Sequence, residues 1–186
     1  MNVEDLIVNC ELSHIIFITG GTKSGKSEFA EYLAKSAKKL SYIALSEKHI
    51  EDKEWQEKIN LHRKRRPNDW KLIETTDLLN TLCIEKGPLL IDSIGGFVME
   101  SIGKEHNEWS TKMNLLISLL IKRKCITIIV GEQVGWSLVS EYKIGNTYIE
   151  RIGELQKRIT KISKDNWLAI NGRSIKIDEI SLEIPN

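Results

Sequence analysis

Short apolar runs alternate with amphipathic segments along most of the chain. Such runs of aliphatic and β-branched residues are typical of strands in a parallel sheet that is covered on both faces. The pattern predicts strands at residues 15–18, 41–45, 70–74, 89–92 and 125–130, and a terminal strand pair at 167–170 and 175–177 with Asn171 and Gly172 in its turn.

The segments between these runs repeat apolar residues at helical spacing. Phe29, Leu33 and Ala37 fall on one face of a helix that should continue to about Lys38. Further helices are predicted at 50–64, 78–85, 109–122 and 147–163, of which the first is highly charged and should be ended by Pro67. This alternation predicts a three-layer α/β domain with a mostly parallel central sheet, preceded by an extension over residues 1–13.

The charge balance and the cysteines narrow the class of protein. Lysine and arginine number 27 against 26 acidic residues in 186, so charge favours neither nucleic acid nor a membrane as a partner. Cys10, Cys83 and Cys125 are widely spaced and odd in number, which predicts buried free thiols in a reducing cytoplasm rather than disulfides or a zinc site. We see no signal peptide in residues 1–12 and no apolar stretch of membrane-spanning length, so we expect a cytoplasmic protein.

The clearest chemical signal follows the first predicted strand. Residues 20–27 match the Walker A pattern G-x-x-x-x-G-K-[ST], and a predicted helix follows at once, which is the context that the motif requires. Glycines let the backbone N–H groups converge on a phosphate, and the helix N-terminus adds further donors. We expect Lys26 to reach the β- and γ-phosphates and the Ser27 hydroxyl to coordinate Mg²⁺. The predicted phosphate-binding residues are Gly20, Gly21, Thr22, Lys23, Ser24, Gly25, Lys26 and Ser27.

The alternative is a glycine-rich turn with an incidental lysine, which the flanking strand and helix disfavour. We therefore assign residues 14–186 to a single P-loop nucleotide-binding catalytic domain.

Two further residues are candidates for chemistry. Asp92 ends an apolar strand, where P-loop proteins place the Walker B acid that helps to hold Mg²⁺. His62 lies among arginines and lysines just before Pro67. It is either part of a solvated basic helix end or a nucleophilic or acid–base imidazole to which the cations steer nucleotide phosphates.

Several landmarks in order resemble one known family, over roughly residues 15–177. They are the P-loop from Thr19 to Ser27, Tyr42-Ile43-Ala44, His62-Arg63-x-x-Arg66-Pro67-x-x-Trp70 followed by Glu74, Leu90-Ile91-Asp92-Ser93, Val134-Gly135-Trp136 and the closing strand after Trp167. The chain resembles the bifunctional adenosylcobinamide kinases and adenosylcobinamide-phosphate guanylyltransferases of cobalamin biosynthesis.

The resemblance implies a RecA-like P-loop fold, a trimer and two reactions. A nucleoside triphosphate (ATP or GTP) would phosphorylate adenosylcobinamide, and GMP from GTP would then be transferred to that phosphate, which gives adenosylcobinamide-GDP. The second reaction would pass through a guanylylated histidine, for which His62 is the matching position. By the same resemblance, Arg63 and Glu74 would contact the nucleotide, with Lys26 catalytic in both steps and Ser27 and Asp92 holding Mg²⁺.

The chain also departs from the family pattern. Where the family has Asn-Glu-Val-Gly, this sequence has Glu132-Gln133-Val134-Gly135, and residues 140–142, 147–150 and 156–157 differ as well. Two alternatives to the bifunctional enzyme therefore stay open: an enzyme that retains one of the two activities, and a P-loop protein that binds nucleotide for a regulatory purpose.

Overall fold

A computed structural model describes residues 14–45, 66–136 and 140–185. Its elements follow in the order β1 (Ile15–Gly20), α1 (Lys26–Ala34), β2 (Ser41–Ala44), β3 (Lys71–Glu74), α3 (Leu78–Ile84), β4 (Leu89–Asp92), α4 (Gly95–Glu100), α5 (His106–Ile121), β5 (Thr127–Glu132), α6 (Lys143–Ile162), β6 (Asp165–Ile170), β7 (Arg173–Lys176) and η2 (Ile177–Glu179).

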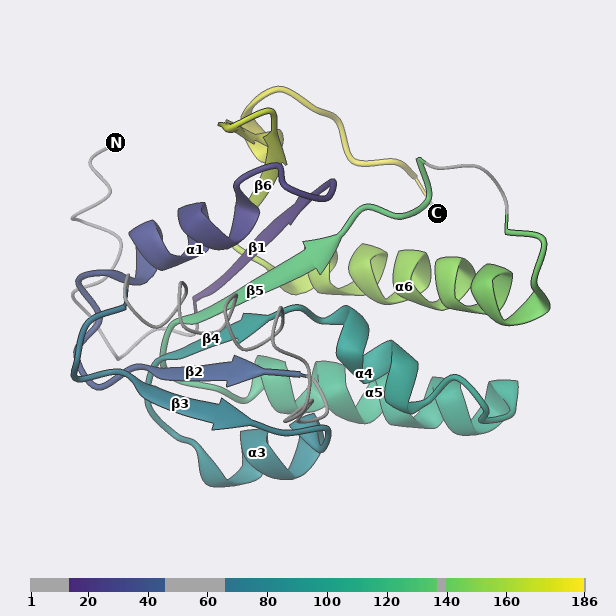
Figure 1. Cartoon of the computed structure of the whole chain (residues 1–186), viewed down its shortest axis with the longest axis horizontal. Helices are drawn as coiled ribbons and strands as arrows, with labels where there is room; N and C mark the ends of the chain where they lie inside the picture. Colours follow the sequence, from purple (N-terminus) through teal and green to yellow (C-terminus); the bar gives the residue numbers. More distant parts are fainter. Residues whose placement is uncertain (1–13, 46–65, 137–139, 186) are drawn as a thin grey trace, which may run out of the picture.

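The strands form one sheet in the order β3-β2-β4-β5-β1-β6-β7. All neighbours pair in parallel except β6 and β7, which form an antiparallel hairpin. In Figure 1 the arrowheads of β1 to β5 all point toward the same edge of the sheet. The carboxyl ends of these strands therefore gather there, which is where open α/β sheets bind their ligands.

Helices cover both faces of the sheet and bury two separate cores. On one face α1 packs against alternate residues of the central strands, among them Ile16, Ile18, Leu90 and Val130. On the other face α3, α4, α5 and α6 bury Phe17, Ile91 and Ile129 together with their own apolar residues. The predicted three-layer α/β architecture with a mostly parallel sheet and a terminal strand pair is confirmed.

The apolar faces predicted for the helices are those that the structure buries. Leu33 and Ala37 lie in the core on the α1 face, and Phe29 packs against it. The same holds for α5 and α6, whose buried residues include Met113, Leu116, Leu120, Ile152, Leu155 and Ile159.

Several predicted boundaries are wrong, and hydrogen bonding gives the reason. The first helix ends at Ala34 rather than near Lys38, because the Lys35 and Ala37 N–H groups bond three residues back instead of four. The fifth strand spans Thr127–Glu132 rather than 125–130, because its pairing with β1 continues to Gly20. Gly131 and Glu132 are not apolar, so the hydrophobic pattern stopped two residues early.

The helix that begins at Leu78 was predicted at its correct start, but the starts of α5 and α6 were predicted too late. The α5 helix begins at His106, where the Glu108 carboxylate accepts the Glu105 N–H at 3.2 Å. The α6 helix begins at Lys143 rather than Thr147, and Asn146 ties its first turn to Ser140 through two hydrogen bonds. The short helix α4 was not predicted at all.

The remaining predictions of segments and cysteines have mixed outcomes. The extension over residues 1–13 and the charged helix over 50–64 lie outside the described residues. Cys83 is exposed and Cys125 is half-buried, so the prediction of buried thiols is wrong for Cys83, which lies on the solvent side of α3 next to the buried Leu82. In the described part of the chain, no helix combines the length and apolarity that a membrane crossing requires.

Candidate active site

The Walker A segment forms a turn between β1 and α1 whose backbone requires glycine. Gly25 has φ 93° and Lys23 φ 56°, both in the left-handed region. A Cβ on Gly20 would collide with the Ala169 carbonyl of β6. The loop thus opens directly onto the N-terminus of α1, whose first N–H groups are free of intrahelical partners and can bind an anion.

The β6–β7 turn supports this loop from the side. The Gly172 N–H donates to the Ser24 carbonyl at 3.0 Å, and Asn171 and Gly172 have φ 50° and 74°, as a tight two-residue hairpin turn requires. The terminal strand pair therefore belongs to the site, because it holds the phosphate-binding loop in place.

Lys26 and Ser27 lie where the Walker A motif predicts. The Lys26 Nζ donates to the Gly21 carbonyl at 3.0 Å, which keeps the ammonium over the loop. The Ser27 Oγ donates to Asp92 Oδ1 at 3.1 Å. The structure therefore brings together the predicted Walker A and Walker B residues.

Asp92 has a second partner that the sequence did not reveal. The Tyr42 hydroxyl donates to Asp92 Oδ2 in a short hydrogen bond. Burial, and then the charge of Asp92, raise the pKa of Tyr42 well above its usual range, so the phenol remains a donor. Both carboxylate oxygens of Asp92 are thus engaged, one by Ser27 and the other by Tyr42.

The Tyr42 ring links this carboxylate to the segment that follows His62. The Arg66 guanidinium carbon lies 3.4 Å from the centre of the Tyr42 ring, and its Nε is 3.3 Å from Glu31 Oε1 on α1. The Trp70 ring is stacked with the Tyr42 ring, with the two ring centres 6.4 Å apart. Arg66 and Trp70, both part of the family landmark, therefore pack against Tyr42 of β2, and Arg66 also contacts the P-loop helix α1.

A further acid, Glu132, ends β5 beside the loop. Its Oε2 accepts the Gly95 N–H at 3.1 Å. Burial raises the pKa of Glu132 above its usual range, although Lys26 and the hydrogen bond from Gly95 oppose the shift. The Tyr148 hydroxyl of α6 also lies beside Gly95. Burial, together with the charge of Glu132, raises the pKa of Tyr148 to about 12.

The oxygen donors at Ser27 and Asp92 fit a Mg²⁺ ion. Mg²⁺ prefers oxygen ligands and keeps several waters, so few protein ligands suffice when substrate phosphates supply the rest. Because the Ser27 hydroxyl donates a hydrogen bond to Asp92, the lone pairs of the Ser27 oxygen stay available to a cation. Ser27 would bind the ion directly, and Asp92 would hold Ser27 and any water on the ion.

The other predicted site residues lie apart from this cluster or outside the described chain. His62 and Arg63 lie outside the described residues. Glu74 ends β3 and is half-buried, four strand positions from β1, which is about 19 Å at the usual spacing of strands. Glu74 is therefore far from the P-loop along the sheet.

Sequence reasoning missed Tyr42 and Glu132 as site residues. A signal existed for both, since side chains alternate along a strand. Leu90 points to the α1 face, so Asp92, two residues on, points there as well, and Glu132 ends the neighbouring strand β5. Tyr42 pairs with Leu90 in register and shares the same core.

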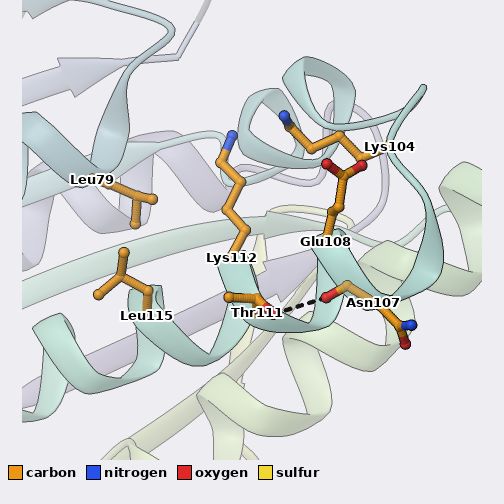
Figure 2. A pocket seen from close by; sticks show the side chains of 7 residues that line it. All are labelled: Leu79, Lys104, Asn107, Glu108, Thr111, Lys112 and Leu115. Carbon is orange, nitrogen blue, oxygen red and sulfur yellow. Dashed lines mark hydrogen bonds between the residues drawn. The ribbon is translucent and has the colours of Figure 1, made fainter.

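A shallow hollow of about 460 Å³ lies elsewhere, between α3 and α5. Figure 2 shows Leu79 and Leu115 facing each other at one end and Lys104 and Glu108 at the other. None of its lining residues belongs to the P-loop, to β4 or to β5, so it is not the phosphate site.

Comparisons with known proteins agree with this geometry. The family model described as cobinamide kinase / cobinamide phosphate guanyltransferase matches residues 16–177. The bifunctional adenosylcobalamin biosynthesis protein CobU of Escherichia coli K12 is 25% identical over 181 residues, which cover 88% of this chain and 99% of that protein. Its counterpart from Salmonella typhimurium LT2 is 27% identical over 181 residues with the same coverage.

Solved structures resemble the chain in fold only. An ATPase from the type III secretion system of pathogenic bacteria has a TM-score of 0.53 at 15% identity, covering 92% of this chain and 59% of its own. A Pyrococcus horikoshii protein has a TM-score of 0.52 at 8% identity, covering 95% and 91%. The fold is thus that of RecA-like P-loop ATPases, and the chain belongs to the cobinamide kinase / cobinamide phosphate guanyltransferase family of cobalamin biosynthesis.

Proposed function

We propose that this chain catalyses both reactions of its family, on adenosylcobinamide and then on adenosylcobinamide phosphate, with a guanylylated His62 as the intermediate of the second. The observation that carries the proposal is the assembly of Lys26, Ser27 and Asp92 at one loop, with the segment that follows His62 packed against it through Arg66.

In the kinase step the loop would hold the triphosphate of the donor. The N–H groups at the start of α1 and the Lys26 ammonium would bind the β- and γ-phosphates and stabilise the negative charge that shifts to the leaving diphosphate. Mg²⁺, held at Ser27 and Asp92, would supply further neutralisation of phosphate charge when bound.

In the transferase step a ring nitrogen of His62 would attack the α-phosphorus of GTP. The new N–P bond replaces the bond to pyrophosphate, which leaves. A phosphate oxygen of adenosylcobinamide phosphate then attacks the same phosphorus, the N–P bond breaks, and His62 is regenerated. Two in-line displacements thus replace one difficult transfer.

The basic residues around His62 support this role by their charge. Arg63, Arg65 and Arg66 would attract the nucleotide phosphates, and Arg66 anchors this segment to α1 through Glu31 at 3.3 Å. Glu74, distant from the loop along the sheet, suits a contact to the ribose or base of the GMP that His62 carries.

Labelled GTP tests the transferase mechanism. The wild-type protein, incubated with α-labelled GTP and Mg²⁺, should acquire label that is stable to alkali and lost in acid, as a phosphoramidate is. His62→Ala should acquire none, and His106→Ala, which changes an exposed histidine at the start of α5, should be labelled like wild type. Absence of label on the wild type would eliminate the guanylyl-histidine.

A separate assay for phosphate transfer from ATP or GTP to adenosylcobinamide distinguishes the alternatives. Kinase activity without label would leave a single-activity enzyme, and nucleotide binding without either reaction would favour a regulatory protein. We further propose a homotrimer in solution, which sedimentation velocity checks: a monomer at micromolar concentration would contradict it.

A further inference from the structure

Glu132 lies at the carboxyl edge of the sheet, next to the P-loop. It ends β5, the strand that lies between the P-loop strand β1 and the Asp92 strand β4, and it pairs in register with Gly20 at the start of the loop. Its carboxylate contacts Gly95 at the start of α4, and it lies close enough to Lys26 and Asp92 for both charges to act on it. A triphosphate on the loop would thus have its terminal phosphate near this carboxylate.

The carboxylate is held in one position and keeps acceptor capacity. The Gly95 N–H binds Oε2 at 3.1 Å, and a Cβ on Gly95 would lie 2.8 Å from the same oxygen and collide with the Tyr148 hydroxyl. Gly95 therefore has to be glycine for Glu132 to lie here. An ionised carboxylate accepts about four hydrogen bonds, so positions remain for a substrate.

Among the described residues, two other acids near Glu132 already have partners for their carboxylates. Asp92 binds Ser27 with one oxygen and Tyr42 with the other. Glu31 is paired with Arg66. Glu132 is half-buried, and within the described part of the chain the charged or titratable side chains that influence it are Lys26 from α1, Asp92 from β4 and Tyr148 from α6.

We propose that Glu132 binds the acceptor hydroxyl of the kinase reaction and takes its proton as the hydroxyl oxygen attacks the γ-phosphorus. The O–H bond breaks and its proton moves to the Glu132 carboxylate, a new O–P bond forms, and the bond from the γ-phosphorus to the bridging oxygen breaks as the nucleoside diphosphate leaves. After the products depart, Glu132 returns the proton to solvent.

The proposal rests on the kinase half of the proposed function and adds a catalytic residue to it. Burial raises the pKa of Glu132, and a general base is more effective when its pKa lies closer to the working pH. Hydrogen bonds from the N–H groups of Glu132 and Gly95, and then the charge of Lys26, oppose this rise of the pKa.

The test is Glu132→Gln, which keeps an oxygen for the Gly95 N–H and removes the base. With adenosylcobinamide as acceptor, kcat of the kinase reaction should fall by about 10² to 10⁴-fold, whereas GMP transfer to supplied adenosylcobinamide phosphate and KM for the triphosphate should change less than about threefold. Glu150→Gln, at an exposed position on α6, is the matched control and should leave both reactions unchanged.

The pH profile separates proton transfer from a structural effect. In the wild type, kcat of the kinase should fall as pH drops through the raised pKa of Glu132, because the protonated acid cannot accept a proton. The residual activity of Glu132→Gln should lack this acid limb.

The outcomes distinguish the role of Glu132 as a base from the proposed function of the chain. A Glu132→Gln protein with a kinase rate within threefold of wild type overturns the role of Glu132 but leaves the proposed function intact. Equal loss of both reactions also overturns it, since that indicates a damaged site. A wild-type protein without kinase activity contradicts the proposed function itself.

Discussion

At the scale of single residues, Asp92 connects the polar side chains beside the P-loop. Its two oxygens accept hydrogen bonds from the hydroxyls of Ser27 on α1 and Tyr42 on β2, so three elements meet at one carboxylate. Such partners orient a group that holds a metal ion, and their loss commonly lowers metal affinity. Tyr42 should therefore affect Mg²⁺ use without touching substrate.

Tyr42→Phe tests this role, because it removes the donor and keeps the ring that contacts Arg66 and Trp70. We expect the Mg²⁺ concentration for half-maximal activity to rise about tenfold and the free energy of unfolding to fall by about 1 kcal/mol. Mg²⁺ titrations of initial rate and urea unfolding measure the two. The control is Tyr32→Phe, an exposed tyrosine on α1, and an unchanged Mg²⁺ dependence in Tyr42→Phe would refute the role.

At the scale of elements, the β6–β7 hairpin stabilises the loop that its turn contacts. Gly172 adopts a left-handed φ of 74° while donating to Ser24, yet a Cβ there would meet no atom within 4 Å. Substitution by alanine thus adds backbone strain with little steric conflict.

Gly172→Ala should lower the free energy of unfolding by about 1–2 kcal/mol, the cost of a left-handed non-glycine residue. It should also weaken nucleotide binding, because the turn that supports Ser24 shifts. Chemical denaturation and a fluorescent nucleotide titration provide the readouts. Gly103→Ala, likewise without atoms near its Cβ but with no left-handed φ, is the matched control, and equal effects of both variants would exclude this explanation.

The start of β6 carries a buried ionic cluster that should make stability depend on pH. Asp165 lies 2.6 Å from His14 Nε2 and 2.7 Å from Lys176 Nζ. Burial alone would raise the pKa of Asp165, but hydrogen bonds from Lys176 and His14 outweigh it and hold the pKa below its usual value.

Because the folded pKa is lowered, Asp165 stabilises the protein above the unfolded value of about 3.9, and that stability is lost as pH falls through the folded pKa. Unfolding free energies measured by urea from pH 6 down to the acid transition should therefore drop more steeply in wild type than in Asp165→Asn. If the free energy of unfolding falls equally with pH in wild type and Asp165→Asn, the cluster does not make stability depend on pH.

The outcome of sequence-based prediction also differs between elements. Every predicted strand within the described residues exists, because buried parallel strands are continuous apolar runs such as 89–92. The helix α4 was missed because Gly95 and Gly96 argue against a helix. Both glycines are needed there by contacts, since a Cβ on Gly96 would collide with Leu45 and one on Gly95 with Tyr148.

At the scale of the whole molecule, strand order decides which residues share the site. The Walker A motif is local, so its position follows from the sequence. Glu132, in contrast, enters the site only because β5 inserts between β4 and β1, and this order is not evident from the apolar pattern. The same order puts Glu74 four strand positions from the loop, which a linear motif cannot reveal.

The central claim of the proposed function is that a single phosphate-binding loop serves two successive reactions and that His62 serves only the second. The most direct measurement assays wild type, Lys26→Ala and His62→Ala in each reaction separately, with adenosylcobinamide phosphate supplied for the second. Lys26→Ala should lose both reactions by at least about 10²-fold, as removal of one charge-stabilising donor does, and His62→Ala should lose GMP transfer while its kinase rate remains. GMP transfer by His62→Ala at the wild-type rate, or either reaction undiminished in Lys26→Ala, would contradict the claim.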